Sequence, residues 1–279
     1  MPVKTGEGRD GTLTAPAEFF FELEGVRHGE LLVGRDPVWD ILKSLGPYLE
    51  DLLSTPLPRF FRPGEPLKRT VLLWDGDLYE NGFEILGGDA TKGSFKVVVS
   101  GRETTEATVL FAGCVLWDDR VKLGRGTVVE PGALIKGPTV VGDRTEIRQG
   151  AYVRGKCLIG DRCVVGHTTE VKSSILLDGA KAGHFAYIGD SILGRDVNLG
   201  AGTKLANLKM TGSTVRVRIG EEQIDTGLRK LGAVIGDRTE IGCNAVTNPG
   251  VLLGMDCLVS PLVSVPAGFY FERSFLGNS

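Results

Sequence analysis

A six-residue period is the feature of this sequence that most limits its possible folds. In a frame starting at Leu123, nine consecutive sixth positions are aliphatic: Leu123, Val129, Ile135, Val141, Ile147, Val153, Ile159, Val165 and Val171. The fourth residue after each of the first eight is small: Thr127, Ala133, Thr139, Thr145, Ala151, Cys157, Cys163 and Thr169. Two five-residue units then shift the count, and the frame continues at Leu176, Ala182, Ile188, Leu193 and Leu199. After an interruption it resumes at Ile235 and runs to Val265.

A strict period of six indicates a triangular coil, which a β-sandwich does not. Each hexad supplies one short strand and one turn, and three hexads complete one turn of a prism. The aliphatic side chain points inward and stacks on its equivalent one coil away, while the small residue fits the confined corner. Glycine, at 40 of 279 residues, is about twice as frequent as the usual ~7%, as many tight turns require. We therefore predict a fold dominated by β-structure, a left-handed parallel β-helix.

The repeat also predicts the domain organisation. Residues 1–108 lack the period and have a mixed character, which indicates a small N-terminal α+β domain. The β-helix domain is expected over residues 109–268, with an inserted loop at 205–234 and a C-terminal tail at 269–279.

Within the N-terminal segment, Asp36-Pro37 is a typical start of a helix. The helical spacing that follows is carried by Leu42, Leu45, Leu49 and Leu52. Gly46-Pro47 should break or kink this helix. Val71–Trp74 and Phe95–Val99 are predicted as short strands.

Composition excludes several classes of function. Lys and Arg total 32 and Asp and Glu total 35, so the formal charge is −3, which argues against a general nucleic-acid binder. The longest apolar stretch, Ala107–Trp117, is too short to span a membrane. The start of the chain is polar and has no signal-peptide core. Five cysteines without framework spacing favour a reducing compartment. We expect a cytoplasmic protein with no membrane or nucleic-acid partner.

The cysteines fit the repeat. Cys157, Cys163 and Cys257 occupy small core positions, which predicts buried, weakly polar side chains. Cys243 lies off that position, and its role stays open. The sequence has no CxxC pair and no His-Cys cluster, so we expect no metal site.

The interruption at 205–234 allows two interpretations. Its first half carries Lys209, Arg216 and Arg218 without an acidic residue, and Arg229-Lys230 follow. The alternating VRVRI segment is typical of a solvated hairpin. A long insertion in a regular coil is also often functional, and its cations would suit an anion-binding loop.

Polar residues stand out against the repeat between 154 and 207: Arg154, Glu170, Lys172, His184, Tyr187, Asn198 and Asn207. Arg154 and Lys172 are separated by three hexads, as are Lys172 and Asp190, so each pair should share a corner one coil apart. Neighbouring cations repel unless an anion or a carboxylate separates them. A salt-bridged surface and a bound anion both satisfy this spacing, and His184 on its own fits either a structural or a catalytic role.

The stretch EVKSSILLDGAKAGHFAYIGDSILGRDVNLGAGTKLAN resembles the acetyltransferase domain of the bifunctional N-acetylglucosamine-1-phosphate uridyltransferase/glucosamine-1-phosphate acetyltransferases. The segments KAGH, YIGD and VNLGAGT carry the likeness. Further on, TGLRKLGAVIGDRTEIG resembles the archaeal sugar-1-phosphate nucleotidylyltransferase/acetyltransferase branch. The resemblance covers about Val109–Gly268. Residues 1–108 lack the family's glycine-rich LxxGxGTRM signature, so we expect no uridyltransferase activity.

The resemblance implies roles for individual residues. His184 corresponds to the catalytic base. The residues that correspond to the sugar-phosphate and amino-sugar ligands are Arg154, Lys172, Glu170, Tyr187, Asn198 and Asn207. Ala201 corresponds to a contact near the acyl-CoA thioester, and Cys243 replaces the family's serine near acetyl-CoA. Lys230 corresponds to a lysine that a neighbouring subunit contributes, which implies a homotrimer. Leu208 replaces the tyrosine of the bacterial Asn-Tyr pair.

The resemblance implies an N-acetyltransferase that moves an acetyl group from acetyl-CoA, its co-substrate, to an amino-sugar 1-phosphate without a metal. Two alternatives remain open at this stage. One is a non-catalytic trimer that binds sugar nucleotides or acts as a scaffold, which the replacements at Leu208 and Cys243 favour. The other is an acyltransferase for a different amine, such as a nucleotide-linked amino sugar.

Overall fold

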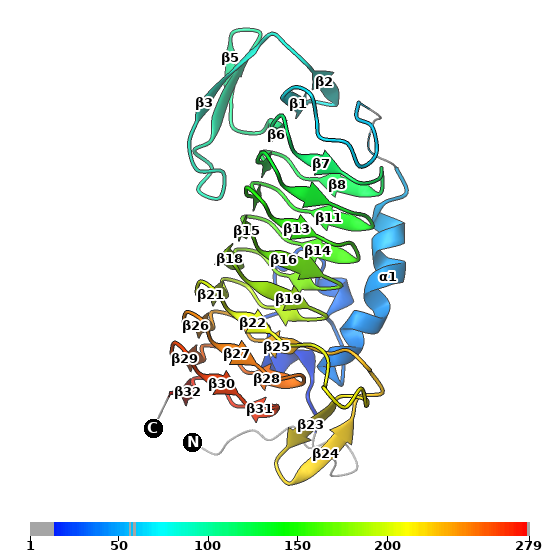
Figure 1. Ribbon diagram of the computed structural model, residues 1–279, viewed down its shortest axis with the longest axis vertical. Helices are drawn as coiled ribbons and strands as arrows, with labels where there is room; N and C mark the ends of the chain where they lie inside the picture. Colours follow the sequence, from blue (N-terminus) through cyan, green and yellow to red (C-terminus); the bar gives the residue numbers. More distant parts are fainter. Residues whose placement is uncertain (1–13, 56, 58–59, 278–279) are drawn as a thin grey trace.

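The strands coil around a common axis and stack into three long sheets (Figure 1). The structure is a computed structural model that describes residues 14–277 except 56 and 58–59. Its main body is the predicted left-handed parallel β-helix. In the regular coils a residue pairs with its equivalent three full hexads later, as Ile147 does with Val165. Where a hexad is shortened the interval is one residue less, as between Val165 and Ala182. The predicted frame is therefore confirmed as the register of the sheets.

The three sheets are called here the first, second and third faces, in the order in which the chain visits them. The first face contains, in spatial order, β2 (Asp77–Tyr79), β1 (Val71–Trp74), β6 (Thr108–Leu110), β9 (Val128–Val129), β12 (Glu146–Ile147), β15 (Val164–His167), β18 (Lys181–His184), β21 (Asn198–Leu199), β26 (Glu240–Ile241), β29 (Leu258–Val259) and β32 (Phe275–Leu276). The second face contains β7 (Val115–Leu116), β10 (Leu134–Ile135), β13 (Tyr152–Val153), β16 (Glu170–Lys172), β19 (Tyr187–Gly189), β22 (Lys204–Leu205), β27 (Val246–Thr247) and β30 (Ser264–Val265). The third face contains β8 (Val121–Leu123), β11 (Thr139–Val141), β14 (Cys157–Ile159), β17 (Ile175–Leu176), β20 (Ile192–Leu193), β25 (Ala233–Ile235), β28 (Val251–Leu253) and β31 (Gly268–Tyr270).

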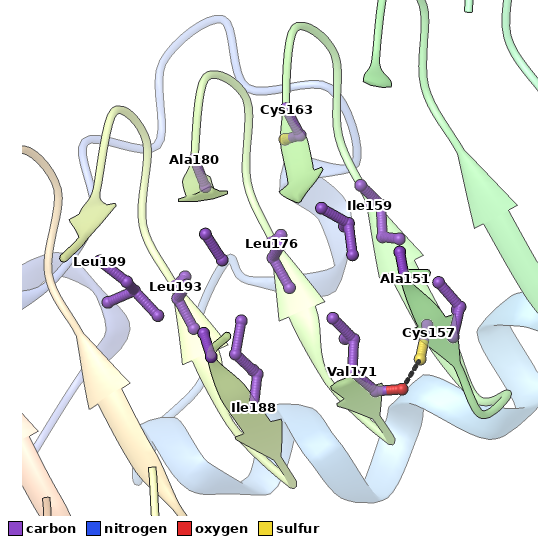
Figure 2. Close-up of a cluster of buried hydrophobic side chains, with 14 of the residues drawn as sticks. Ala151, Cys157, Ile159, Cys163, Val171, Leu176, Ala180, Ile188, Leu193 and Leu199 are labelled. Atoms are coloured by element: carbon purple, nitrogen blue, oxygen red, sulfur yellow. Dashed lines mark hydrogen bonds between the residues drawn. The ribbon is translucent and has the colours of Figure 1, made fainter. Parts of the chain in front are cut away.

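The interior of the prism is filled by the residues that the period predicted. Aliphatic residues of successive coils stack on one another, and small residues fill the corners between them (Figure 2). The threonines among these small residues bond to the next coil: the Thr145 hydroxyl donates to the Gly160 carbonyl at 2.8 Å. Cys157 and Cys163 are fully buried, and burial raises the pKa of both thiols. The prediction of buried structural cysteines is confirmed, and Cys243 is exposed.

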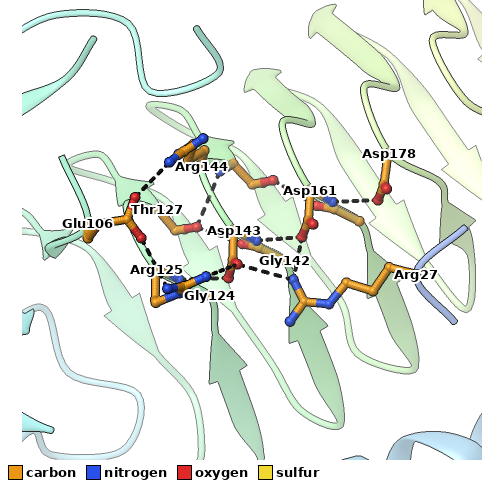
Figure 3. Close-up of polar contacts among 12 residues, drawn as sticks. Arg27, Glu106, Gly124, Arg125, Thr127, Gly142, Asp143, Arg144, Asp161 and Asp178 are labelled. Atoms are coloured by element: carbon orange, nitrogen blue, oxygen red, sulfur yellow. Dashed lines mark hydrogen bonds and ion pairs between the residues drawn. The ribbon is translucent and has the colours of Figure 1, made fainter. Parts of the chain in front are cut away.

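Aspartates reinforce the corner between the third and first faces (Figure 3). The backbone N–H of Asp143 donates to the Asp161 carboxylate at 2.7 Å, and that of Asp161 donates to Asp178 at 2.8 Å. Arg27, from the N-terminal segment, forms ion pairs with Asp161 at 2.6 Å and Asp143 at 3.4 Å. Side chains that link one coil to the next thus also attach the N-terminal segment to the β-helix.

The N-terminal segment 15–53, called the strap here, covers the third face. It contains the helix α1 (Ile41–Leu52) and the 3-10 turns Ala17–Phe19, Gly29–Leu31 and Val38–Asp40. Figure 1 shows α1 lying along the side of the β-helix. The strap packs on the outward residues of the third face, which are themselves apolar and buried: Val140, Leu158, Ile175, Ile192, Val234 and Leu252. The third face is therefore enclosed by the chain's own N-terminal segment.

The helix corrects one expectation. Gly46-Pro47 was expected to break or kink it, and α1 does not break there but continues through Pro47 to Leu52. Proline removes one intrahelical hydrogen bond. Leu45 and Leu49 are fully buried against the β-helix, and this packing offsets the lost bond.

The two ends of the β-helix are closed differently. β1 pairs antiparallel with β6, so residues before 109 cap the first coil. A separate antiparallel sheet stands beside this cap: β3 (Phe83–Gly87), β4 (Lys96–Val99) and β5 (Arg102–Thr104). At the other end, β31 and β32 extend the coil beyond residue 268 to Leu276. Strands near Val71–Trp74 and Phe95–Val99 are confirmed.

The insertion at 205–234 contains the antiparallel hairpin β23 (Arg216–Ile219) and β24 (Glu222–Asp225). Val217 and Ile219 are buried, whereas Arg216 and Arg218 are exposed. The apolar side of the hairpin joins the same cluster as the strap. The alternating VRVRI segment thus forms a hairpin with one packed side and one solvated side.

Candidate functional site

The predicted phosphate ligands lie at the end of the second face, where it turns toward the third. Arg154 follows β13 and Lys172 ends β16, and the pairing of β13 with β16 places them one coil apart. The Arg154 guanidinium donates to Glu170 Oε1 at 2.7 Å, and this bond raises the pKa of Arg154. Arg154 is therefore held by Glu170, the carboxylate that the sequence analysis grouped with it.

Lys172 is held by a residue that was not among the predicted ligands. Its Nζ donates to Asp190 Oδ2 at 3.0 Å, and the amide of Asn207 donates to the same oxygen. Tyr187 lies next to this group on β19, and a Cβ added at Gly189 would come 2.6 Å from the Tyr187 hydroxyl and from Asn207 Nδ2. Gly189 therefore leaves room for both side chains to converge. The three-hexad interval from Lys172 to Asp190 was the signal that could have identified Asp190.

The predicted base and acyl-CoA contacts lie at the opposite end of the second face, at its corner with the first. Ala182 pairs with Leu199, and Leu199 pairs with Ile241. Two residues further on in each coil stand His184, Ala201 and Cys243, which therefore form one column along this corner. His184 and Cys243 are exposed. The residues predicted as the catalytic base and as acyl-CoA contacts therefore lie in one column parallel to the axis of the β-helix.

A second histidine precedes His184 in this column. His167 on β15 pairs in register with His184 on β18. Its Nδ1 lies 3.0 Å from the Gln149 carbonyl oxygen, which can only accept, so Nδ1 is the donor in this hydrogen bond. The exposed ring of Phe185 contacts both histidines, with centroid distances of 5.4 Å to His167 and 6.2 Å to His184. Sequence reasoning missed His167, although its interval to His184 equals one shortened coil.

A shallow groove of about 350 Å³ runs along the first face beyond His184. Its lining residues are Asn198, Gly200, Glu240, Ile241, Gly242, Cys243, Leu258, Val259, Ser260, Pro261 and Phe275. Asn198 donates to Glu240 at 2.8 Å, so it lies at this groove and not beside Lys172. A Cβ on Gly200 would come 2.6 Å from the Cys243 nitrogen, so Gly200 lets the backbones of two neighbouring coils approach closely at this groove.

Lys230 lies in the insertion, in a backbone bridge with Leu208. The next residue, Leu231, donates its N–H to the Asn207 carbonyl at 3.0 Å. The insertion therefore folds back beside the Lys172–Asp190–Asn207 group of its own chain. Lys230 is exposed there.

The predicted site residues thus form two groups at the two ends of the second face. Arg154, Lys172 and Asn207 lie at one end, and His184 lies at the other. Five residues separate His184 from Gly189, the partner of Lys172 in the sheet, which corresponds to at most about 16 Å of extended strand. Tyr187 lies between the two groups. A small ligand lying over this strand would have cations at one end and the imidazole at the other.

Neither a metal site nor a membrane span emerges from the described part of the chain. Among those residues, no group of three or more His, Cys, Asp or Glu side chains is arranged to hold a metal ion. No helix in the same range is both long enough and apolar enough to cross a bilayer.

Several known proteins are similar to this chain in sequence. Residues 135–223 match the family described as the GMPPB C-terminal domain. The uncharacterized acetyltransferase YaiX of Escherichia coli O6:K15:H31 is 33% identical over 178 residues, which are 61% of this chain and 77% of that protein. This chain belongs to the left-handed β-helix acetyltransferases.

Other members of this acetyltransferase group are larger. A bifunctional sugar-1-phosphate nucleotidylyltransferase/acetyltransferase of Sulfurisphaera tokodaii is 42% identical over 96 residues, 34% of this chain and 24% of that protein. The bifunctional protein GlmU of Methanocaldococcus jannaschii is 37% identical over 94 residues, 34% of this chain and 23% of that protein. The chain spans about a quarter of the length of these relatives, and the predicted resemblance is confirmed for the matching part.

A UDP-N-acetylglucosamine acyltransferase from Campylobacter jejuni is similar in structure, with a TM-score of 0.34 and 16% identity over 56% of this chain and 66% of that one.

Proposed function

We propose that this protein transfers an acetyl group from acetyl-CoA to the amine of an amino-sugar 1-phosphate. The observation that carries the proposal is the arrangement around the second face. His184 lies in one column with Ala201 and Cys243 beside a shallow groove, and the cations Arg154 and Lys172 lie at the far end of the same face.

The reaction needs a base, because an ammonium group is not a nucleophile. Histidine changes its protonation near neutrality and suits this role. In the proposed reaction the sugar amine attacks the thioester carbonyl and its proton passes to His184. The attack forms the C–N bond and a tetrahedral intermediate; its collapse breaks the C–S bond, and the CoA thiolate leaves and takes up the proton from His184. A backbone N–H near Ala201 would stabilise the tetrahedral oxyanion.

The groove suits the extended arm of acetyl-CoA. Gly200 and Gly242 line it with partly exposed backbone, and Leu258 and Phe275 contribute exposed apolar surface at its far end. Amides of an extended arm can bond to exposed backbone groups, while its methylenes lie on the apolar side chains. Cys243 lines the groove one coil from Ala201, close to where the thioester would lie.

The cations at the other end suit a phosphate. The Arg154 guanidinium has five N–H donors and gives one to Glu170. The Lys172 ammonium has three donors and gives one to Asp190. Donors therefore remain for phosphate oxygens, with Arg154 as a planar two-pronged contact and Lys172 as a point charge. Tyr187 between the two ends would lie against the sugar.

The proposal includes a homotrimer in the cytoplasm, with Lys230 offered to the site of a neighbouring subunit. The support is geometric: His184 and Phe185, at the corner between the first and second faces, are exposed, whereas the third face is covered by the strap. Neighbouring copies would therefore meet on the two faces that carry the candidate site.

The test measures thiol release from acetyl-CoA with a panel of amino-sugar 1-phosphates. Wild-type protein should release thiol with at least one of them, and the His184→Ala variant should release it roughly 10²–10⁴-fold more slowly. The Lys181→Ala variant, altered at an exposed position on the same strand, should retain the wild-type rate. Measurable binding of every substrate without thiol release would replace this proposal with a non-catalytic sugar-binding role.

A further inference from the structure

Lys204 brings a positive charge to the corner that carries the proposed base. It lies on β22 of the second face. Its Nζ donates to the carbonyl oxygen of Phe185 at 2.8 Å and to that of Gly202 at 2.7 Å. Phe185 directly follows His184, and Gly202 directly follows Ala201. The ammonium is therefore anchored between the coil of the base and the coil of the predicted thioester contact.

Lys204 is held in place without losing its net charge. Arg154 and Lys172 each form an ion pair with a carboxylate, whereas Lys204 forms none with the described residues and is bonded to carbonyl oxygens. These oxygens belong to neutral peptide groups, so they fix the ammonium and do not neutralise it. An ammonium has three N–H donors, and the two carbonyls take two of them. One donor remains for a ligand at this corner, where Lys204 is exposed.

The position of this charge coincides with the place where the proposed reaction develops a negative charge. Tyr187, the neighbour of Lys204 on the second face, would lie against the sugar, and His184 would take the proton of its amine. The thioester carbonyl would lie near Ala201. When the amine attacks, the electron pair of the C=O double bond moves onto the carbonyl oxygen, which becomes an oxyanion. Lys204 is anchored between the two partners of this step.

We propose that Lys204 is a catalytic residue that stabilises this oxyanion. The inference rests on the proposed function and adds a residue to the same site. The ammonium keeps its proton throughout and donates its remaining hydrogen bond to the oxyanion, beside the backbone N–H near Ala201. When the tetrahedral intermediate collapses, the C=O bond re-forms, the C–S bond breaks and the thiolate takes the proton from His184. A fixed cation attracts the oxyanion more strongly than the neutral carbonyl, and this difference lowers the barrier.

Infrared spectroscopy of bound acetyl-CoA tests this contact without any turnover. A positively charged donor polarises a C=O bond and lowers its stretching frequency, and acetyl-CoA with an isotopically labelled carbonyl gives a separate band for this bond. Lys204→Met keeps the apolar stem and removes the charge, so the band should move to higher frequency than in wild-type protein. Lys181→Met removes an exposed cation from β18 on the first face and should leave the band unchanged. The same band in wild type and in Lys204→Met would overturn the inference.

Kinetics then separate this inference from the proposed acceptor. Lys204→Met should lower kcat roughly 10²–10³-fold, the usual loss of one oxyanion donor, while the Kd of acetyl-CoA and the melting temperature stay close to those of wild type. Lys204→Arg retains a cation with N–H donors and should lose less. Equal kcat in wild type and Lys204→Met, or equal losses in the two variants, would contradict the inference. A carbonyl band that depends on Lys204, without transfer to any amino-sugar 1-phosphate, would support the inference and reject the proposed acceptor.

Discussion

At the scale of single residues, the candidate site contains cations that are already paired. The Arg154 guanidinium donates a hydrogen bond to Glu170, and Lys172 and Asn207 both donate to Asp190. These carboxylates solve the repulsion that the three-hexad spacing creates, and they hold the cations in fixed positions before a ligand arrives. A salt-bridged surface and a preorganised anion site are therefore the same set of residues.

The proposed base gives the sharpest prediction at this scale. His184→Ala should lower kcat by roughly 10²–10⁴-fold, the usual contribution of a positioned general base. KM for the sugar phosphate should change little, because Arg154 and Lys172 are untouched. The melting temperature should stay close to that of wild type, since His184 is exposed. A variant that melts early but keeps its turnover per folded molecule would make His184 a packing residue.

Asp143 and Asp178, at the corner between the third and first faces, should affect stability in opposite ways as the pH changes. Burial raises the pKa of Asp143, but the Arg125 N–H and the charge of Arg27 outweigh burial and the pKa falls below its ordinary value. Burial raises the pKa of Asp178, and the N–H of Asp161 does not compensate. Ionised Asp143 thus stabilises the fold above about pH 4, and this contribution is lost as the pH falls through its folded pKa. The stability that protonated Asp178 contributes is fully present below its unfolded pKa and is lost as the pH rises through its raised folded pKa.

Two isosteric variants test these signs. Asp143→Asn should lower the free energy of unfolding by up to about 1 kcal/mol at pH 7, and the difference from wild type should shrink at pH values near 3. Asp178→Asn keeps an oxygen that can accept from the Asp161 N–H. Its free energy of unfolding relative to wild type should therefore be higher at pH 7 than at pH 3. Urea denaturation at both pH values measures each difference. The same pH trend in both variants would contradict the assignment.

At the scale of elements, the strap is part of the fold of the β-helix. Leu45 and Leu49 of α1 share one apolar cluster with Leu158 and Ile175 of the third face. A helix of 12 residues has little stability alone, so its packing on the sheet maintains it. In turn, α1 covers outward apolar side chains of the third face that would otherwise be exposed to water.

Leu45→Ala should therefore destabilise the whole protein by about 2–5 kcal/mol, the usual cost of truncating a fully buried leucine. We expect a single unfolding transition at a lower denaturant concentration, seen equally by circular dichroism and by tryptophan fluorescence, because Trp39 lies in the same cluster. Asp51→Ala, at an exposed position of the same helix, serves as the control. A separate early transition of the strap with an unchanged main transition would show that the two parts fold independently.

At the scale of the whole molecule, the strap and the insertion decide which surfaces can meet another copy. Both pack in the apolar cluster of the third face. The corner between the first and second faces, with His184 and Phe185, is exposed. Closed rings of three place every site at an equivalent interface, which fits a site whose parts lie on these two faces.

We expect light scattering to give a mass three times that of the 29.9 kDa chain. Phe185→Glu places a charge at the open corner, on a side chain that is 52% exposed in one chain, and should dissociate the assembly. Val33→Glu places the same charge on the strap, at a side chain 60% exposed, and should leave the mass unchanged. A stable wild-type species with the mass of a single chain at micromolar concentration would contradict the trimer.

The sequence by itself determined the coil. An inward aliphatic side chain every sixth residue and a small residue at each corner leave one arrangement that buries both, so the frame from Leu123 to Val265 could be read without coordinates. The hexad register also determined that Arg154 and Lys172 share a corner. Each hexad makes the same kinds of contact as the hexad before it, so a short-range sequence pattern is enough to predict this part of the fold.

The tertiary structure decided what no period encodes. Pro47 sits within a continuous helix because that helix packs on a sheet distant in sequence. Asp190 and His167 joined the candidate site through pairings between coils, and Lys204 reached the Phe185 carbonyl in the same way. Residues 15–53 cover the third face because their apolar side chains meet an apolar column there. These contacts join segments that share no repeat, so only the folded chain brings them together.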